Sequence, residues 1–381
     1  MPAPRSKIAL VCDWYAPQIG GIEAQIHGLA RGLAARGYAP VVITTTPGPT
    51  TVEGVPVRRL GLARLARWNL AIDPRATATV ARVLTDERAA LVHAHSLQSP
   101  LAHAAVRAAR ALGLPCVWTQ HSLLSGAGAA AVGLGAALSG AGAAANAITA
   151  VSTAAAAATR ALLGRPVDVV HNGVALAAWA RPPARGAGSP TVITVSRLFA
   201  HKRVDLLVRA LALVAARTGA AAPRTWIVGD GPARPALEAL AARLGVAAST
   251  RFVGALRPAQ VAALLGQSDV FVLPNPREAF GLAALEARAA GLPVIARRES
   301  GARDLIVDGR HGVLCGSDGE VAAAIARLCA EPATRAALAA HAGQDLAHYD
   351  WDHAVARYLA VYARCLGGVV ASSRGLARAA A

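Results

Sequence analysis

The sequence predicts an α/β protein made of two doubly wound domains, each built on a parallel sheet. The chain of 381 residues has the length of two ordinary domains. Short apolar runs alternate with helix-compatible segments in both halves, as in sheets whose strands are buried on both faces. Between the halves, residues 180–190 have the Pro, Gly and Ser content of a linker. We expect domains over residues 1–180 and 181–348, a final helix over 349–366 and a disordered tail over 367–381.

The excess of basic over acidic residues restricts the kinds of partner that the protein is expected to bind. Lys and Arg number 39 against 22 Asp and Glu, a formal net charge of +17, which favours anionic lipid or a polyanionic substrate. The arginines lack the aromatic interleaving and motifs of nucleic-acid binders, so no nucleic-acid partner is expected. Five scattered cysteines and an N-terminal apolar run too short for a signal peptide predict a cytoplasmic protein. The positive charge also suggests that the protein contacts the inner face of the plasma membrane peripherally.

The N-terminal half begins with a buried strand over residues 7–12, then a loop with Gly20 and Gly21, then a helix ending at Gly37. Glycines allow such a loop to approach a phosphate or a sugar closely, although paired glycines are also common in turns. Further strands are predicted at residues 41–43, 91–93, 117–119, 148–151 and 167–170.

Histidines stand at or just beyond the ends of two of these strands. In open parallel sheets, ligands bind outside the carboxyl ends of strands. His121 follows a strand whose end is expected to face that crevice, so it is a candidate site residue. For His95 and His103 a structural role and a functional role are left equally open.

A basic and apolar segment over residues 58–68 combines four arginines with leucines and Trp68. Such a segment suits contact with an anionic membrane, where each basic residue contributes about 1 kcal/mol. A solvated loop and helix edge is the alternative.

The C-terminal half repeats the alternation of strand and helix. Arg197 and Lys202 follow its first strand, and both are candidates to neutralise an anion. The segment GDGP, which begins at Gly229, and the segment FVGAL, which begins with Phe252 and Val253, follow further strands.

The stretch over residues 274–296 predicts a strand end, a loop, a short helix, a turn and a strand. Glu286 falls on the apolar face of that helix, where an unpaired carboxylate would cost several kcal/mol, roughly, so a cation or a ligand hydroxyl should meet it. Glu278 precedes the helix, and Phe280, Gly281 and Leu282 supply the free N–H groups of its start, an anion site. Two carboxylates beside an anion site suit a nucleotide sugar.

Glu278 and Glu286, with seven residues between them in the setting EAFGLAALEA, resemble the E-x7-E signature of family 4 retaining glycosyltransferases. Residues 93–124 are also similar to the catalytic subunit of phosphatidylinositol N-acetylglucosaminyltransferase and to phosphatidylinositol mannosyltransferases. The resemblance implies the GT-B fold, in which two Rossmann-like domains face each other across a cleft, and a final helix that crosses back to the N-terminal domain.

The resemblance also implies roles for the candidate residues. Glu286 would bind the ribose hydroxyls, Glu278 and His121 would orient the sugar, and the base would lie near Phe252 and Val253. The remaining donor-binding residues are those that hold the diphosphate or line the pocket, namely Arg197, Lys202, Gly281, Phe280, Leu282, Gly229, Gly20 and Gly21.

The chain departs from the family pattern at two points. Arg203 stands where many relatives carry Gly, and the segment from Ser300 to Asp304 replaces Gly-Gly followed by Glu. A D-x-D at residues 350–352 is interpreted as a helix cap, so no metal and no cofactor is expected.

The predicted function is retaining, metal-independent transfer of a hexose from a nucleotide diphosphate sugar to an acceptor hydroxyl, on a lipid or a glycan, by front-face displacement. A nucleotide-sugar epimerase of the same architecture is an alternative, as is a non-catalytic, basic, membrane-peripheral scaffold. The residues leave the base, the sugar and the acceptor open.

Overall fold

The computed structural model describes residues 6–18, 20–65, 68–124, 126–180, 189–219 and 222–379, without the side chains of Thr218 and of residues 368–379. Contacts within the chain divide it into two compact units. Unit 1 consists of residues 1–173 and 351–381, and unit 2 consists of residues 174–350. Predicted linker residues 181–188 lie outside the described residues.

Unit 1 is built on a sheet with the strand order β10-β9-β8-β7-β1-β2-β4-β3, parallel except where β3 meets β4. Its strands are β1 (Lys7–Val11), β2 (Ala39–Thr44), β3 (Thr51–Val52), β4 (Val55–Arg59), β7 (Leu91–His95), β8 (Cys116–Gln120), β9 (Ala147–Ala150) and β10 (Asp168–Val169). The short strands β5 (Arg64–Leu65) and β6 (Leu70–Ala71) pair separately. Since the strand order reverses at β1, the carboxyl ends of β1 and β7 mark the switch point of this unit.

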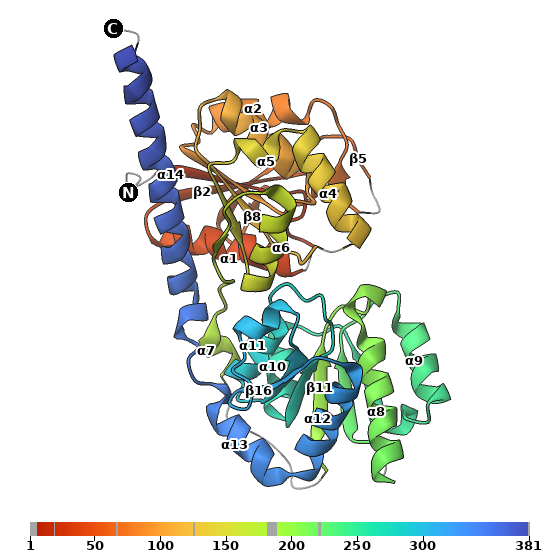
Figure 1. The fold of residues 1–381 in the computed structure, drawn as a ribbon. Coiled ribbons are helices and arrows are strands. Elements are labelled where there is room, and N and C mark those ends of the chain that lie inside the picture. The colour runs from red at the N-terminus through yellow and green to blue at the C-terminus, as the bar shows by residue number, and fades with distance from the viewer. Residues whose placement is uncertain are drawn as a thin grey trace. The chain divides into compact units, whose positions relative to one another are not determined.

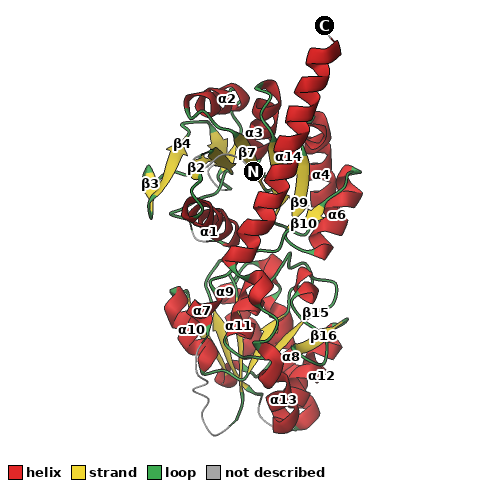
Figure 2. Cartoon of the chain, turned by 90° about the vertical axis from the view of Figure 1, so that its left-hand side faces the viewer, coloured by secondary structure: helices red, strands yellow, loops and turns green. Residues whose placement is uncertain are grey.

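Helices cover both faces of the unit 1 sheet (Figure 1). They are α1 (Gly21–Ala35), α2 (Ala76–Asp86), α3 (Pro100–Ala111), α4 (Gly126–Leu138), α5 (Ala141–Ala144), α6 (Thr153–Leu163) and α14 (Trp351–Ala379). The last of them, α14, packs along α1, as Figure 2 shows from another side. Its residues Val355, Tyr358 and Tyr362 are buried in the same apolar cluster as Leu29 and Leu33 of α1.

The start of α14 depends on two glycines. A Cβ atom at Gly28 would lie 2.0 Å from the Trp351 ring, and one at Gly173 would lie 2.5 Å from it. The indole ring therefore lies directly on backbone. The helix then continues to Ala379, whereas the sequence suggested a disordered tail from residue 367. Alanine, leucine and arginine in this stretch favour the helical backbone once the packed first turns have nucleated it.

Unit 2 contains a parallel sheet with the strand order β13-β12-β11-β14-β15-β16. Its strands are β11 (Thr191–Val195), β12 (Arg224–Val228), β13 (Thr250–Gly254), β14 (Val270–Leu273), β15 (Val294–Arg297) and β16 (Gly312–Cys315). Its α-helices are α7 (Leu176–Trp179), α8 (Val204–Thr218), α9 (Arg234–Arg243), α10 (Pro258–Gly266), α11 (Leu282–Ala289), α12 (Asp318–Ala330) and α13 (Pro332–Ala342). Its 3-10 turns are η1 (Ala200–Lys202), η2 (Ala247–Ser249), η3 (Gly301–Asp304) and η4 (Ala347–Tyr349).

The contacts place the division between the units at residues 173 and 174, whereas the sequence suggested 180 and 181. The difference lies in α7, which packs on α10 and α11 of unit 2. The backbone N–H of Val174 also donates to the carbonyl of Tyr349, 2.9 Å away in the same unit. No helix in the described part of the chain is long and apolar enough to cross a bilayer.

Candidate functional site

In unit 2 the site residues predicted from the sequence gather at one edge of the sheet. The strand order reverses between β11 and β14, which pair in parallel at Val192 with Val270 and at Ile193 with Phe271. The chain leaves β11 toward Arg197 and Lys202, and it leaves β14 toward Glu278. The carboxyl ends of two strands at such a switch point are where open α/β sheets bind ligands.

Lys202 and Glu278 form an ion pair at this edge. The Lys202 ammonium donates to the Glu278 carboxylate over 2.8 Å, and the two side chains are 24% and 17% exposed. The Asn275 amide lies 3.5 Å from the same oxygen, Oε2. The Glu278 carbonyl accepts from the Gly301 N–H at 2.8 Å, which ties the loop before α11 to η3. A cation and a carboxylate are thus held together, and Glu278 Oε1 has no hydrogen-bond donor among the residues that the structure describes.

The start of α11 offers unoccupied backbone donors. Gly281, its N-cap, has φ 95°, and no side chain caps the helix. Within the described residues, the N–H groups of Leu282 and Ala283 donate no hydrogen bond. A Cβ atom at Gly281 would lie 3.0 Å from Leu273 Cδ2, so glycine is required by both conformation and space. Phe280, in contrast, buries its ring in the interior, 6.0 Å from the Tyr349 ring, so only its backbone is available to a ligand.

Glu286 is half-buried on α11 and has no hydrogen-bond or ion-pair partner among the described residues. Burial raises the pKa of its carboxyl group to about 8. The sequence required either a cation or a ligand hydroxyl for this group. The described arginines and lysines do not meet it, and a carboxyl group with this raised pKa is mostly protonated at pH 7.

The loop that carries Arg197 is fixed by two glycines of the GDGP segment. Cβ atoms at Gly229 and Gly231 would lie 1.9 Å and 2.5 Å from the carbonyl oxygens of Ser196 and Leu198. Both glycines have positive φ, 124° and 156°. These close approaches could not be read from the GDG pattern, which is also common in ordinary turns. The Arg197 guanidinium itself is exposed and lies 5.4 Å from the Phe199 ring centroid.

Phe252 and Val253 lie on β13, beside the GDGP segment. The Gly229 N–H donates to the carbonyl of Gly254 over 2.8 Å. Arg234 reaches the carbonyl of Phe252 at 3.3 Å. The segment predicted to lie near the base and the GDGP segment are therefore neighbours.

In unit 1, three histidines form a cluster at the carboxyl ends of β7 and β8, in which His93 and His95 are buried and His121 is partly exposed. His95 Nδ1 lies 3.0 Å from His121 Nε2, and the rings of His93 and His95 are 4.0 Å apart. Desolvation lowers the pKa of all three, that of His121 to about 4, so the imidazoles are neutral at pH 7. His103 instead lies 2.9 Å from the Ser139 hydroxyl and 2.8 Å from the Leu97 carbonyl.

Gly20 and Gly21 lie at the start of α1, and Ile19 before them is outside the described residues. The Glu23 carboxylate occupies the space beside Gly20, since a Cβ atom there would lie 2.3 Å from its Oε2.

The basic segment is bound into unit 1 through most of its arginines. Arg58 pairs with Glu87 at 2.5 Å, and Arg59 and Arg64 donate to backbone carbonyls, while Arg67 lies outside the described residues. The apolar side chains of this segment are partly exposed to solvent, and Trp68 is 56% exposed.

The described residues contain no group of three or more His, Cys, Asp or Glu side chains that could hold a metal ion. Asp350 and Asp352 of the D-x-D stand at the start of α14, and Asp352 pairs with Arg36 at 2.7 Å.

Family models match both units. One described as "Glycosyltransferase Family 4" matches residues 19–178, and one described as "Glycosyl transferases group 1" matches residues 178–345. The glycogen synthase of Mycobacterium tuberculosis strain H37Rv is 30% identical over 393 residues, which cover 93% of this chain and 94% of that enzyme. The chain belongs to glycosyltransferase family 4. The expected family and enzyme class are confirmed.

Two further similarities extend this assignment. A human phosphatidylinositol N-acetylglucosaminyltransferase subunit is 29% identical to this glycosyltransferase over 309 residues, covering 78% of the chain and 63% of the human protein. The structure of HepE from Anabaena in complex with UDP and glucose matches with a TM-score of 0.77 and 22% identity, over 94% of this chain and 99% of that one. The fold is GT-B, with two Rossmann-like units, as predicted.

Arg203 in this glycosyltransferase explains one departure from the family pattern. It adopts the left-handed conformation, φ 56° and ψ 35°, which glycine accepts without strain. Its guanidinium pairs with Asp205 at 3.0 Å. The conformation typical of Gly is kept here with a larger side chain, and the ion pair offsets part of the strain.

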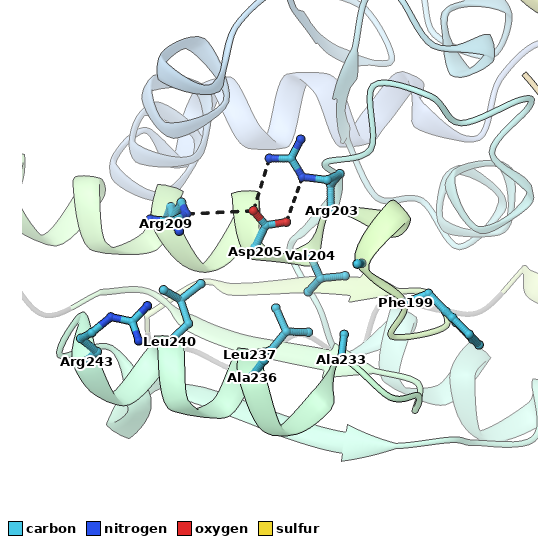
Figure 3. Close-up of a pocket in the computed structure, with 11 residues that line it drawn as sticks. Phe199, Arg203, Val204, Asp205, Arg209, Ala233, Ala236, Leu237, Leu240 and Arg243 are labelled. Carbon is cyan, nitrogen blue, oxygen red and sulfur yellow. Dashed lines mark hydrogen bonds and ion pairs between the residues drawn. The ribbon is translucent and has the colours of Figure 1, made fainter. Parts of the chain in front are cut away.

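A separate groove of about 480 Å³ lies between α8 and α9 (Figure 3). Arg203 and Arg209 lie on either side of Asp205 at its rim, and Leu237 and Leu240 form part of its floor. Arg197, Lys202, Glu278 and Glu286 do not line it. The groove is therefore distinct from the predicted site of the glycosyltransferase.

Proposed function

We propose that this glycosyltransferase transfers a hexose from a nucleotide diphosphate sugar to an acceptor hydroxyl, with retention of the anomeric configuration and without a metal ion. The observation that carries the proposal is the arrangement at the switch point of unit 2. There the Lys202–Glu278 ion pair, the unoccupied N–H groups of α11 and the unpartnered Glu286 lie on two neighbouring strand ends and one helix.

Each part of that arrangement suits one part of the donor. The N–H groups at Leu282 and Ala283, with Lys202 and Arg197, suit a diphosphate, whose charge grows as it departs. Glu286 suits the ribose hydroxyls, which would supply the donors that it lacks. Glu278 suits a sugar hydroxyl, and we propose that His121 is a second group that orients the sugar.

Fixed cations and helix N–H groups take the place that a divalent metal has in other transferases. Retention then follows from front-face displacement, in which the departing phosphate oxygen accepts the proton of the acceptor hydroxyl. The acceptor is a lipid or a glycan hydroxyl. Because the similar HepE protein of Anabaena was solved in complex with UDP and glucose, UDP-sugars are the first donors to try.

A donor screen that follows release of nucleoside diphosphate tests the proposal. We expect release that depends on an acceptor, persists in excess chelator, and falls about 10²-fold or more in Lys202→Met and Arg197→Met. Arg243→Met in the groove removes the same charge elsewhere and should leave turnover unchanged. Loss of activity with chelator and its return with manganese would contradict metal independence. An inverted product anomer would contradict retention, and an epimerised free nucleotide sugar would indicate the epimerase.

We further propose a cytoplasmic enzyme that contacts anionic membrane through the basic segment, where Leu65 and Trp68 are exposed beside Arg64. Sedimentation with vesicles containing phosphatidylserine should fall in Trp68→Ser relative to the parent. Equal sedimentation of the two proteins would exclude this surface.

A further inference from the structure

His95 and His121 share one hydrogen bond. Which of the two rings donates it depends on which nitrogen of each ring carries the proton. The Nδ1 atom of His95 lies 3.0 Å from Nε2 of His121. The other nitrogen of His95, Nε2, is fully buried and has no hydrogen-bond partner within the described residues. His121 is partly exposed, and its Nδ1 contacts no described partner.

A neutral imidazole carries one N–H, so only two arrangements are available. If His121 Nε2–H donates, His95 must accept at Nδ1 and carry its own proton at Nε2. That proton would be a buried N–H without an acceptor, which costs about 1–3 kcal/mol and is rare in proteins. If His95 Nδ1–H donates, the buried atom is a bare lone pair, which costs less.

We propose that His95 is a positioning residue that donates from Nδ1 to His121 and thereby holds His121 as its Nδ1–H tautomer, a hydrogen-bond donor toward the substrate. The ligand atom that this tautomer recognises is an oxygen that accepts a hydrogen bond, such as the oxygen of a sugar hydroxyl. His95 is 1% exposed and has no access to a ligand itself. The inference deepens the role of His121 proposed above and rests on it.

The surroundings of His95 fix its ring. It packs against the His93 ring at an interplanar angle of 36°, and Nδ1 and Nε2 of His93 lie 2.7 Å from the Tyr362 hydroxyl and 2.6 Å from the Thr119 hydroxyl. Thr119 in turn lies 2.6 Å from the Thr149 hydroxyl. Since a histidine side chain free in water favours the Nε2–H tautomer, the protein has to impose the other one on His121.

Long-range ¹H–¹⁵N NMR of the imidazole nitrogens in the full-length chain reads the tautomers directly, without substrate. We expect both His95 and His121 to carry their proton at Nδ1 at pH 7. A proton at Nε2 of His121 would overturn the proposal.

Two substitutions at His95 separate donation from packing. In His95→Asn the amide nitrogen takes the place of Nδ1–H, so His121 should stay in the Nδ1–H tautomer with turnover within about 2-fold of the parent. In His95→Leu the donor is lost, so His121 should shift toward Nε2–H and kcat should fall about 10-fold, the effect of one hydrogen bond. KM for the acceptor should not change.

Thermal unfolding of both variants checks that they fold, and the NMR spectrum of His95→Leu remains informative even when activity is absent. Equal kcat for Leu and Asn with His121 still in the Nδ1–H form would show that His95 does not set the tautomer. Full activity of His121→Phe with the expected tautomers in the parent would instead defeat the proposed role of His121, while His95 would still set the tautomer.

Discussion

The Glu286 carboxyl group carries a pKa of about 8 in the folded chain because burial disfavours its charge. In the unfolded chain the group ionises near its ordinary value of 4.5. Between these two values the native state binds more protons than the unfolded state. The stabilising effect of protonation is therefore complete below about pH 4.5 and is lost as pH rises toward 8.

We expect the ligand-free Glu286→Gln variant to be as stable as the parent near pH 5 and more stable near pH 9. A neutral amide has nothing to ionise, and each pKa unit corresponds to about 1.4 kcal/mol. Urea unfolding of both proteins at several pH values measures the difference. At pH 9, where the Glu286 carboxyl group is ionised, nucleoside diphosphate affinity should nevertheless weaken by about 1.5–3 kcal/mol in the variant, since hydrogen bonds to a charged group are lost. Parallel stability curves would contradict the raised pKa of Glu286, and an unchanged affinity would contradict the ribose assignment.

Arg203 offers a second test on the scale of one residue. Arg203→Ala keeps the left-handed backbone and removes the pair with Asp205, so we expect it to be less stable than the parent. Arg203→Gly also removes the pair but relieves about 1 kcal/mol of strain. Thermal unfolding should show that Arg203→Gly is more stable than Arg203→Ala by that amount. A Gly variant less stable than the Ala variant would show that the backbone at this position is not strained.

On the scale of the element, α11 is held by a buried cation. The Arg288 guanidinium donates to the carbonyls of Ala342 and Gln344, at 2.9 Å and 2.7 Å, and to that of Leu305. Burial lowers its pKa to about 10, so it is still charged at pH 7. The helix that presents Glu286 is thereby bound to the segment after η3 and to the end of α13.

Arg288→Met should cost about 3–5 kcal/mol, because it leaves three carbonyls without donors. Arg327→Met on α12 is the matched control, since this arginine is exposed, and it should change stability by less than about 0.5 kcal/mol. Chemical unfolding of both variants compares them. Similar losses in the two would mean that the carbonyls find other partners.

The sequence was most informative where a site is local to one element. Glu278, Gly281 and Glu286 lie within nine residues. Helix periodicity and the one glycine therefore suffice to place them on one short helix and the loop before it. The contact of Lys202 with Glu278 joins residues 76 apart and depends on β11 lying next to β14, which no local pattern specifies.

The hydrogen bond between His95 and His121 could not be predicted from the sequence for the same reason, because it requires the neighbouring strands β7 and β8 to pair in register. The helical course of α14 beyond residue 366 was likewise not expected from the sequence, although the preceding turns are packed.

On the scale of the whole molecule, unit 1 is assembled from two distant parts of the chain. We expect Gly28→Ala to destabilise it by about 1–3 kcal/mol, because the new methyl group would overlap the Trp351 ring. Gly128→Ala in α4 is the matched control, a helical glycine with open space around it, and it should be neutral or stabilising by about 0.5–1 kcal/mol. Thermal unfolding distinguishes the two, and equal melting temperatures would contradict the packing of α14 described here.

The origin of α14 also determines the order in which the chain matures on the ribosome. Residues 1–173 are synthesised first, yet their apolar cluster lacks Val355, Tyr358 and Tyr362 until the far end of the chain emerges. Between them lie the 177 residues of unit 2, counted from 174 to 350, which take roughly 10–35 s to translate. During that interval the surface that α14 will cover is exposed in the nascent chain. The unit that is made first is therefore completed last.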